Sequence, residues 1–205
     1  MKEPFILKSS KNPKVDADYD AYCLPFKGNN LIGAHMMGIN DFEKPERIYF
    51  VADFESIPEY DFPSTDMTFP VMSKRMLKAL LDVGNFRHQT IPVTMVDDSY
   101  LDDQFDSKGR LKPDVPYNDD YIAVQLKEYA NVFNYKKSLY EKDLVFPDEV
   151  GIIHRLVLME LPVGFTPIFR IKEVMKLLFI NSEAKVFLEK MQIKGCIFEP
   201  VEVSG

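Results

Sequence analysis

The chain has 205 residues and a net charge of −7, with 46% hydrophobic and 28% charged residues. This composition is typical of a globular protein with its own core, and the acidic balance argues against nucleic-acid binding, which needs a basic surface. No apolar run reaches the roughly 18 residues of a membrane span, and residues 1–14 lack the apolar stretch of a signal peptide. We therefore expect a cytoplasmic protein that binds neither nucleic acid nor membrane.

The first half of the chain predicts short strands and one clear helix. Apolar pieces between turn residues predict strands at 4–7, 21–26, 31–38 and 47–51. Residues 57–69 mix proline and acidic residues without periodicity and predict a loop. Apolar residues then recur at helical spacing, which predicts a helix with Ser73 as its N-cap and Gly84 as a left-handed end.

The second half predicts more strands and a second capped helix. Residues 128–142 fit either a short helix or a strand running into a turn, and Pro92 indicates an edge position for its strand. Ser182 begins an amphipathic helix that Gly195 ends. The predicted strands are 90–96, 121–126, 151–161, 168–171, 177–180 and 196–203. The expected fold is α+β, with a mixed, mainly antiparallel sheet and a few short amphipathic helices.

The residues with reactive side chains form no recognisable motif. Cys23 and Cys196 lie far apart without CxxC spacing, which predicts two buried free thiols. His35, His88 and His154 are widely spaced, and the apolar surroundings of His154 predict a core histidine. No nucleophile elbow and no phosphate-binding loop occurs. We therefore expect no catalytic residue, no cofactor and no metal.

Residues 97–120 hold eight aspartates against three basic residues, and so carry most of the net charge. Such a segment fits a cation site, a surface for a basic partner or a solvated loop. A calcium loop of the EF-hand type starting at Asp102 needs glycine where Ser107 stands and a glutamate that the segment lacks. Interleaved aromatic residues favour a recognition surface over a solvated loop, because aromatic rings anchor interfaces and charge speeds association. The predicted partner-binding residues are Asp97, Asp98, Tyr100, Asp102, Asp103, Phe105, Asp106, Tyr117, Asp119 and Asp120.

The C-terminal part carries a specific pattern: an apolar-Phe-Arg strand, a second apolar strand, a Ser-capped helix, a glycine and a strand ending in Phe-x-Pro-Val. The residues of this pattern are Ile168, Phe169, Arg170, Ser182, Gly195, Phe198, Pro200 and Val201. An earlier turn holds Asn134, Lys137 and Ser138. In these features the chain resembles a family of immunity proteins from bacterial polymorphic-toxin systems. The likeness covers residues 69–203 and fades over 1–68.

The resemblance implies an antidote without enzymatic activity. Such a protein binds the catalytic domain of a secreted or contact-delivered toxin in interbacterial competition. A basic, nuclease-like toxin domain would suit the acidic segment, which is longer here than the link usual in that family. We expect one domain over residues 1–205. A hydrolase built from dispersed histidines and carboxylates, an antidote that removes the toxin's modification, and an adaptor stay open as alternatives, as does the oligomeric state.

Overall fold

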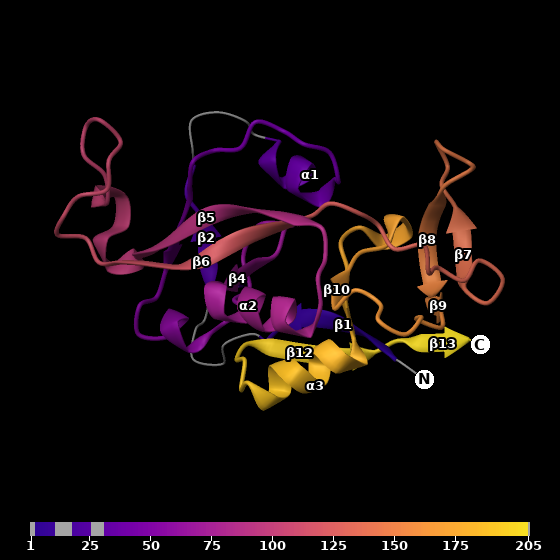
Figure 1. The fold of residues 1–205 in the computed structure, drawn as a ribbon. Helices are drawn as coiled ribbons and strands as arrows, with labels where there is room; N and C mark the ends of the chain where they lie inside the picture. Colours follow the sequence, from indigo (N-terminus) through magenta and orange to yellow (C-terminus); the bar gives the residue numbers. More distant parts are fainter. Residues whose placement is uncertain (1–2, 11–17, 26–30, 205) are drawn as a thin grey trace.

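The computed structural model describes residues 3–10, 18–25 and 31–204. Strands account for 36% of the structure and helices for 18%, and most strand pairs are antiparallel, so the fold is α+β as predicted. Two larger sheets lie at the centre of the molecule (Figure 1). A hairpin projects at one end, and the acidic segment projects at the other (Figure 1).

The five-stranded sheet has the order β2-β3-β5-β6-β4. Its strands are β2 (Ala21–Cys23), β3 (Ile48–Ala52), β5 (His88–Asp97), β6 (Tyr117–Leu126) and β4 (Val71–Ser73). The β3–β5 pair is parallel and the other pairs are antiparallel. Successive residues of β6 alternate between two cores, because side chains on a strand point to opposite faces. Helix α1 (Ile32–Met37) covers one face of this sheet and α2 (Lys74–Val83) the other (Figure 1).

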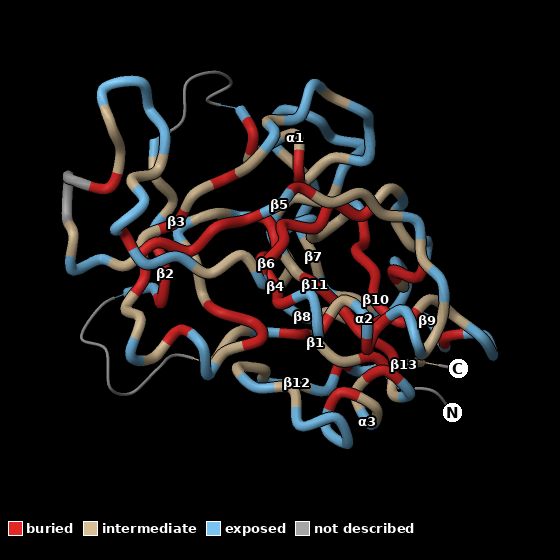
Figure 2. The backbone as a smooth tube through the Cα atoms, turned by 60° about the vertical axis from the view of Figure 1, so that its left-hand side comes forward, coloured by how far each residue is buried: buried red, intermediate tan, exposed pale blue. Residues whose placement is uncertain are grey.

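The four-stranded sheet is antiparallel throughout, with the order β10-β11-β1-β12. Its strands are β10 (Ile168–Phe169), β11 (Leu178–Asn181), β1 (Pro4–Ser9) and β12 (Cys196–Pro200). Strand β1 therefore lies between two strands from the end of the chain. Helix α3 (Ser182–Lys190) packs beside α2 against the core that the two large sheets share, seen as buried backbone at the centre of Figure 2.

Two small sheets complete the fold. Strands β9 (Val157–Met159) and β13 (Glu202–Ser204) are parallel, and β7 (Leu139–Lys142) and β8 (Val150–Arg155) form the projecting hairpin. Three short 3₁₀ turns, η1 (Ile57–Glu59), η2 (Asp98–Asp103) and η3 (Lys172–Val174), lie in connections. The ambiguous region 128–142 is thus a turn followed by a strand, and the single strand expected at 151–161 is split between β8 and β9.

The strand predicted at 31–38 was wrong, because this segment forms α1. Ile32 and Met36 are buried four residues apart, which is helical spacing, while strand alternation would have buried every second residue. The amide of Gln125 in β6 lies within 2.7 Å of the carbonyls of His35 and Gly38 and so binds the end of this helix. A contact between residues so distant in sequence is invisible to local patterns.

Several expected helix and strand ends differ in detail. Ser73 caps α2 as predicted, with its hydroxyl accepting from the Met76 amide at 3.0 Å. Gly84 has φ 176°, which is extended backbone, so the left-handed end predicted there was wrong. Pro92 lies in a central strand and is paired with Ile122 of β6, but it precedes the part of β5 that pairs with β3, which begins at Val93. This explains how a residue without an amide hydrogen fits β5.

The N-cap of α3 lies one residue earlier in the sequence than predicted. Asn181 accepts from the Ala184 amide at 2.7 Å, so Ser182 is the first helical residue and not the cap. The helix ends at Lys190, before the predicted end at Gly195, and Gln192 takes a positive φ of 53°. Gly195 has φ 83° in the turn that leads into β12.

Candidate functional site

The acidic segment is a structured excursion between β5 and β6 (Figure 1). Its ends are held together, because Val96 pairs with Tyr117 across the two strands. Inside the excursion, Gln104 and Val115 are buried, and the Lys112 amide donates to the Gln104 carbonyl at 3.0 Å. The segment therefore has a small packed centre of its own, which a simple solvated loop lacks.

Some of the predicted binding residues hold this excursion in shape. Asp97 accepts from the Ser99 amide at 2.9 Å and caps η2. Asp106 accepts from the amides of Arg110 and Lys108, and it forms an ion pair with the Arg110 side chain at 2.8 Å. The hydrogen bond from the Arg110 amide, followed by that from its side chain, lowers the pKa of Asp106. These carboxylates are already engaged within the segment.

Two further predicted residues anchor the excursion to the sheet. Asp119 forms an ion pair with Arg47 and accepts a hydrogen bond from the buried Thr94 hydroxyl. Phe105 packs edge-on against the ring of Tyr49 in β3, with the ring centres 5.1 Å apart. The structure thus gives Asp119 and Phe105 a role in positioning the projection.

Three of the predicted binding residues that the structure describes are exposed. They are Asp98, Asp120 and Tyr117, which exposes 57% of its surface. Desolvation, reinforced by the charges of Asp53 and Asp97, raises the pKa of Asp98. Tyr100 is half-buried, and the side chains of Asp102 and Asp103 lie outside the described part of the structure.

A cleft of about 530 Å³ adjoins the first residues of β6. Asp120, Asn118 and Tyr121 form one side of it, and Asp61 and Arg75 lie on another. The cleft thus borders the exposed carboxylate of Asp120. Sequence reasoning missed it, because its walls come from four separate parts of the chain.

Asp61 is the centre of the hydrogen bonds at this cleft. Its buried carboxylate accepts from the Ser73 hydroxyl at 2.6 Å, from the Lys194 amide at 2.9 Å and from the Arg75 guanidinium, with Nε at 3.0 Å. Burial alone would raise the pKa of Asp61, but the bonds from Arg75, Lys194 and Ser73 outweigh it, and the pKa is lowered. The charged carboxylate therefore joins the N-cap of α2 to the turn after α3.

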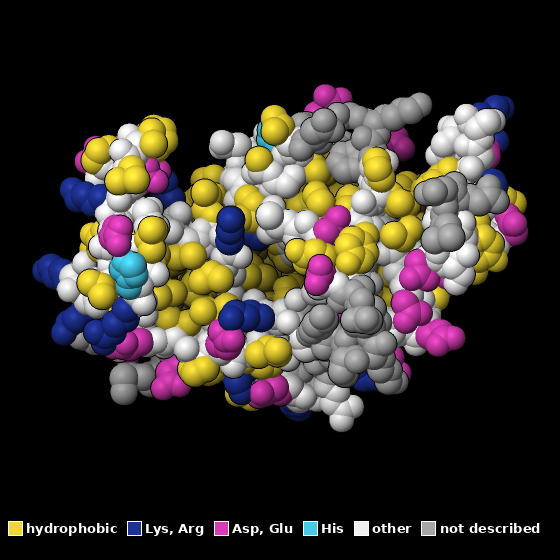
Figure 3. Space-filling model, turned by 180° about the vertical axis from the view of Figure 1, so that it is seen from behind, with side chains coloured by type: hydrophobic (Ala, Val, Ile, Leu, Met, Phe, Trp, Pro, Cys, Tyr) yellow, Lys and Arg dark blue, Asp and Glu magenta, His cyan; other side chains and the backbone are white. Residues whose placement is uncertain are grey.

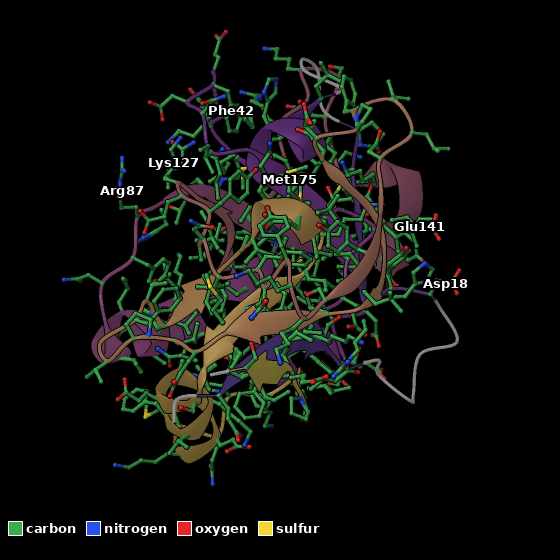
Figure 4. All side chains as sticks on the ribbon, turned by 90° about the vertical axis from the view of Figure 1, so that its right-hand side faces the viewer. Asp18, Phe42, Arg87, Lys127, Glu141 and Met175 are labelled. Atoms are coloured by element: carbon green, nitrogen blue, oxygen red, sulfur yellow. The ribbon has the colours of Figure 1, made fainter. Side chains whose placement is uncertain are left out.

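The three histidines do not converge on a common site. His35 stacks on Phe42 with ring centres 5.0 Å apart, and Nδ1 of His88 lies 3.0 Å from a backbone carbonyl. His154 was predicted in the core, but it is exposed on β8 and pairs with Glu141 at 2.8 Å. Strand β8 belongs to the projecting hairpin and has no fully buried residue, and Figure 4 shows Glu141 at the periphery of the molecule.

The two cysteines are free and half-buried, in β2 and β12. Desolvation is the main cause that raises the pKa of each thiol to about 12. Among the described residues, no group of three or more His, Cys, Asp or Glu side chains is placed to hold a metal ion. Neither observation assigns chemistry to these groups.

Compared with known protein families and with curated protein sequences, the chain matches none. Within residues 3–10, 18–25 and 31–204, no helix has both the length and the apolar character to cross a membrane. The geometry of the chain itself therefore carries the functional argument. Its most distinctive feature is the acidic projection, held by internal contacts and exposed at Asp98, Tyr117 and Asp120.

Proposed function

We propose that the protein is an immunity protein that neutralises a bacterial toxin by binding the toxin's catalytic domain through the acidic projection. The observation that carries this proposal is the exposure of Asp98, Tyr117 and Asp120 on a projection in which Asp106 and Asp119 are paired with arginines. A preformed projection loses little conformational entropy on binding. The sequence resemblance to immunity proteins supports the same proposal.

The chemistry of the projection favours a basic partner. Exposed carboxylates attract a positively charged cleft and raise the association rate, while a central tyrosine contributes most of the affinity. Toxin domains that act on nucleic acid present such basic clefts. Asp119 and Phe105 then keep the projection in place without contacting the toxin.

The test is co-expression and binding with the toxin encoded beside the protein's gene. The triple variant Asp98→Asn, Tyr117→Ala, Asp120→Asn should raise the Kd by about 100-fold, because a tyrosine anchor contributes about 2 kcal/mol and each charge roughly 0.5 kcal/mol. The salt dependence of association should flatten as well. Loss of rescue in the co-expression assay should accompany the weaker binding.

A matched control makes the same changes elsewhere. Tyr135 is half-exposed, and Asp82 and Asp148 lie outside the projection, so the variant Asp82→Asn, Tyr135→Ala, Asp148→Asn has the same charge and ring loss. This control should bind and protect like the unmodified protein. Unchanged affinity and salt dependence in the projection variant would overturn the proposed surface, and a toxin that does not bind at all would overturn the proposed function.

A further inference from the structure

A second cavity, of about 370 Å³, lies between β1, β11 and the loop that precedes β4. Residues 6–9 of β1 and residues 62–65 and 67–71 of that loop line it. Tyr19, Arg170 and residues 176–178 complete the lining. A hollow with hydrophobic walls is visible on the rear face of the molecule (Figure 3).

Three basic residues line the cavity although the protein is acidic. Lys8, Arg170 and Lys176 are among its lining residues, and no Asp or Glu is among the described residues that line it. Lys8 pairs with Glu199, which lies outside the lining, at 2.7 Å, and Lys176 is exposed. In a chain with net charge −7, such a concentration of basic groups is unexpected and indicates an anion site.

Arg170 is the most buried of these basic residues, with 2% of its surface exposed. Among the described residues, its Nε has no hydrogen-bond partner, and its Nη1 donates a long bond of 3.5 Å to the Met36 carbonyl. Its titratable neighbour is Tyr129, whose pKa burial raises, so that this phenol stays neutral near pH 7 and does not balance the charge. Desolvation lowers the pKa of Arg170 to about 10, which still leaves the guanidinium charged near pH 7.

A buried charge without a partner is unfavourable, and proteins normally pair such a group. The chain pairs Arg75 with Asp61 and Arg47 with Asp119, so the missing carboxylate at Arg170 stands out. A guanidinium is a planar donor that binds carboxylates and phosphates through two parallel hydrogen bonds. An anion entering the cavity would supply the missing partner.

We propose that this cavity binds a small organic oxyanion, a phosphate monoester or a carboxylate attached to an apolar body. The guanidinium of Arg170 holds the anionic group, and the ammonium of Lys176 attracts it at the rim. Hydroxyl groups of the loop before β4, such as those of Thr65 and Thr68, are available as further donors, while Phe62 and Leu178 receive the apolar part. This site does not depend on the proposed toxin binding.

The experiment measures thermal unfolding and calorimetric binding with four probes at millimolar concentration. Phenyl phosphate and benzoate should raise the Tm by several degrees, inorganic phosphate should raise it less, and phenol should leave it unchanged. Whether phenyl phosphate or benzoate gives the larger shift identifies the preferred anion. Failure of both organic anions to bind would overturn the proposal.

The variant Arg170→Met separates binding from structure. It removes the unpaired charge, so the unliganded variant should unfold at the same or a higher Tm, while the shift caused by phenyl phosphate or benzoate should vanish. The control Arg155→Met removes a surface arginine that pairs with Glu202 and should keep the full shift. A variant Arg170→Met that keeps the ligand shift would refute the site.

If Arg170→Met does not fold, the exposed Lys176→Met keeps the proposal testable. Loss of the Lys176 ammonium should weaken binding several-fold and reduce the salt dependence of binding, without changing the Tm of the unliganded protein. Unchanged affinity in Lys176→Met, together with a low Tm in Arg170→Met, would assign Arg170 to the core and overturn the proposed site.

Discussion

Replacing Asp61 with alanine should test the network that joins the two helices α2 and α3. The carboxylate accepts from the Ser73 hydroxyl, from the Lys194 amide and twice from Arg75, and Ser73 in turn caps α2 at the Met76 amide. Alanine at position 61 leaves the buried Ser73 hydroxyl and the Lys194 amide without their acceptor. We therefore expect the variant to fold with a clearly lower free energy of unfolding.

The size of the loss follows from the exposure of the partners. Hydrogen bonds to charged groups contribute about 1.5–3 kcal/mol each, and breaking a fully buried ion pair costs about 3–5 kcal/mol. The Arg75 side chain is 51% exposed and regains water, so the lower end applies and we expect a loss of about 3 kcal/mol. For a chain of this size, that loss lowers the Tm by about 6–12 °C.

The loss should also depend on pH. Because the folded pKa of Asp61 lies below its ordinary value, its contribution is fully present above the unfolded pKa of about 3.9 and disappears as the pH falls through the folded pKa. The difference between wild type and Asp61→Ala in urea unfolding should stay constant from about pH 7 to pH 5 and shrink below about pH 4.

The control is Asp82→Ala, which breaks an exposed pair with Lys78 on the surface of α2. Such a pair contributes about 0.3–0.5 kcal/mol. The reasoning fails if Asp61→Ala costs no more than this control at neutral pH. It fails equally if the cost of Asp61→Ala does not change when the carboxylate becomes protonated.

Two further predictions concern glycines and thiols. Gly195→Ala should lower the free energy of unfolding in urea by about 2–3 kcal/mol, because φ is 83° and the added Cβ would lie 2.8 Å from the Tyr60 ring. The control Gly109→Ala, at φ 74° in open space, should lower it by about 1 kcal/mol. Equal costs would contradict the role of the Tyr60 contact. Burial raises the pKa of Cys23 and of Cys196 to about 12, so both thiols should react with a disulfide reagent at pH 8 more slowly in the folded protein than in urea, by roughly 100-fold or more. Rapid labelling of the folded protein would show that burial does not protect these thiols.

The fold class and most strands could be predicted because they depend on local patterns. Alternating and apolar runs identified the strands of both large sheets except β4, and Ser73 was identified as the cap of α2. The strand prediction for residues 31–38 failed because a short helix with two buried residues carries little periodic signal. Asn181 and Ser182 are both good N-caps, so only the backbone could decide between them.

The candidate sites were less predictable than the fold. The composition of residues 97–120 marked the projection, but internal partners such as Arg47 and Tyr49 come from β3, far away in sequence. These partners decide which carboxylates face outward. The cavity around Arg170 had no sequence signal, because its defining property is a buried guanidinium whose Nε has no hydrogen-bond partner among the described residues. An absence of that kind is visible only after the chain has folded.

The central position of β1 has a consequence for biosynthesis. Both neighbours of this strand, β11 and β12, are made long after β1, because most of the described chain lies between them in sequence. On the ribosome, β1 has two bare edges until β11 and β12 emerge, and unpaired strands are prone to associate with other chains. The sheet can therefore close only after all the intervening residues have been made, so folding should be slow, and nascent chains should depend on chaperones more than chains whose neighbouring strands are consecutive.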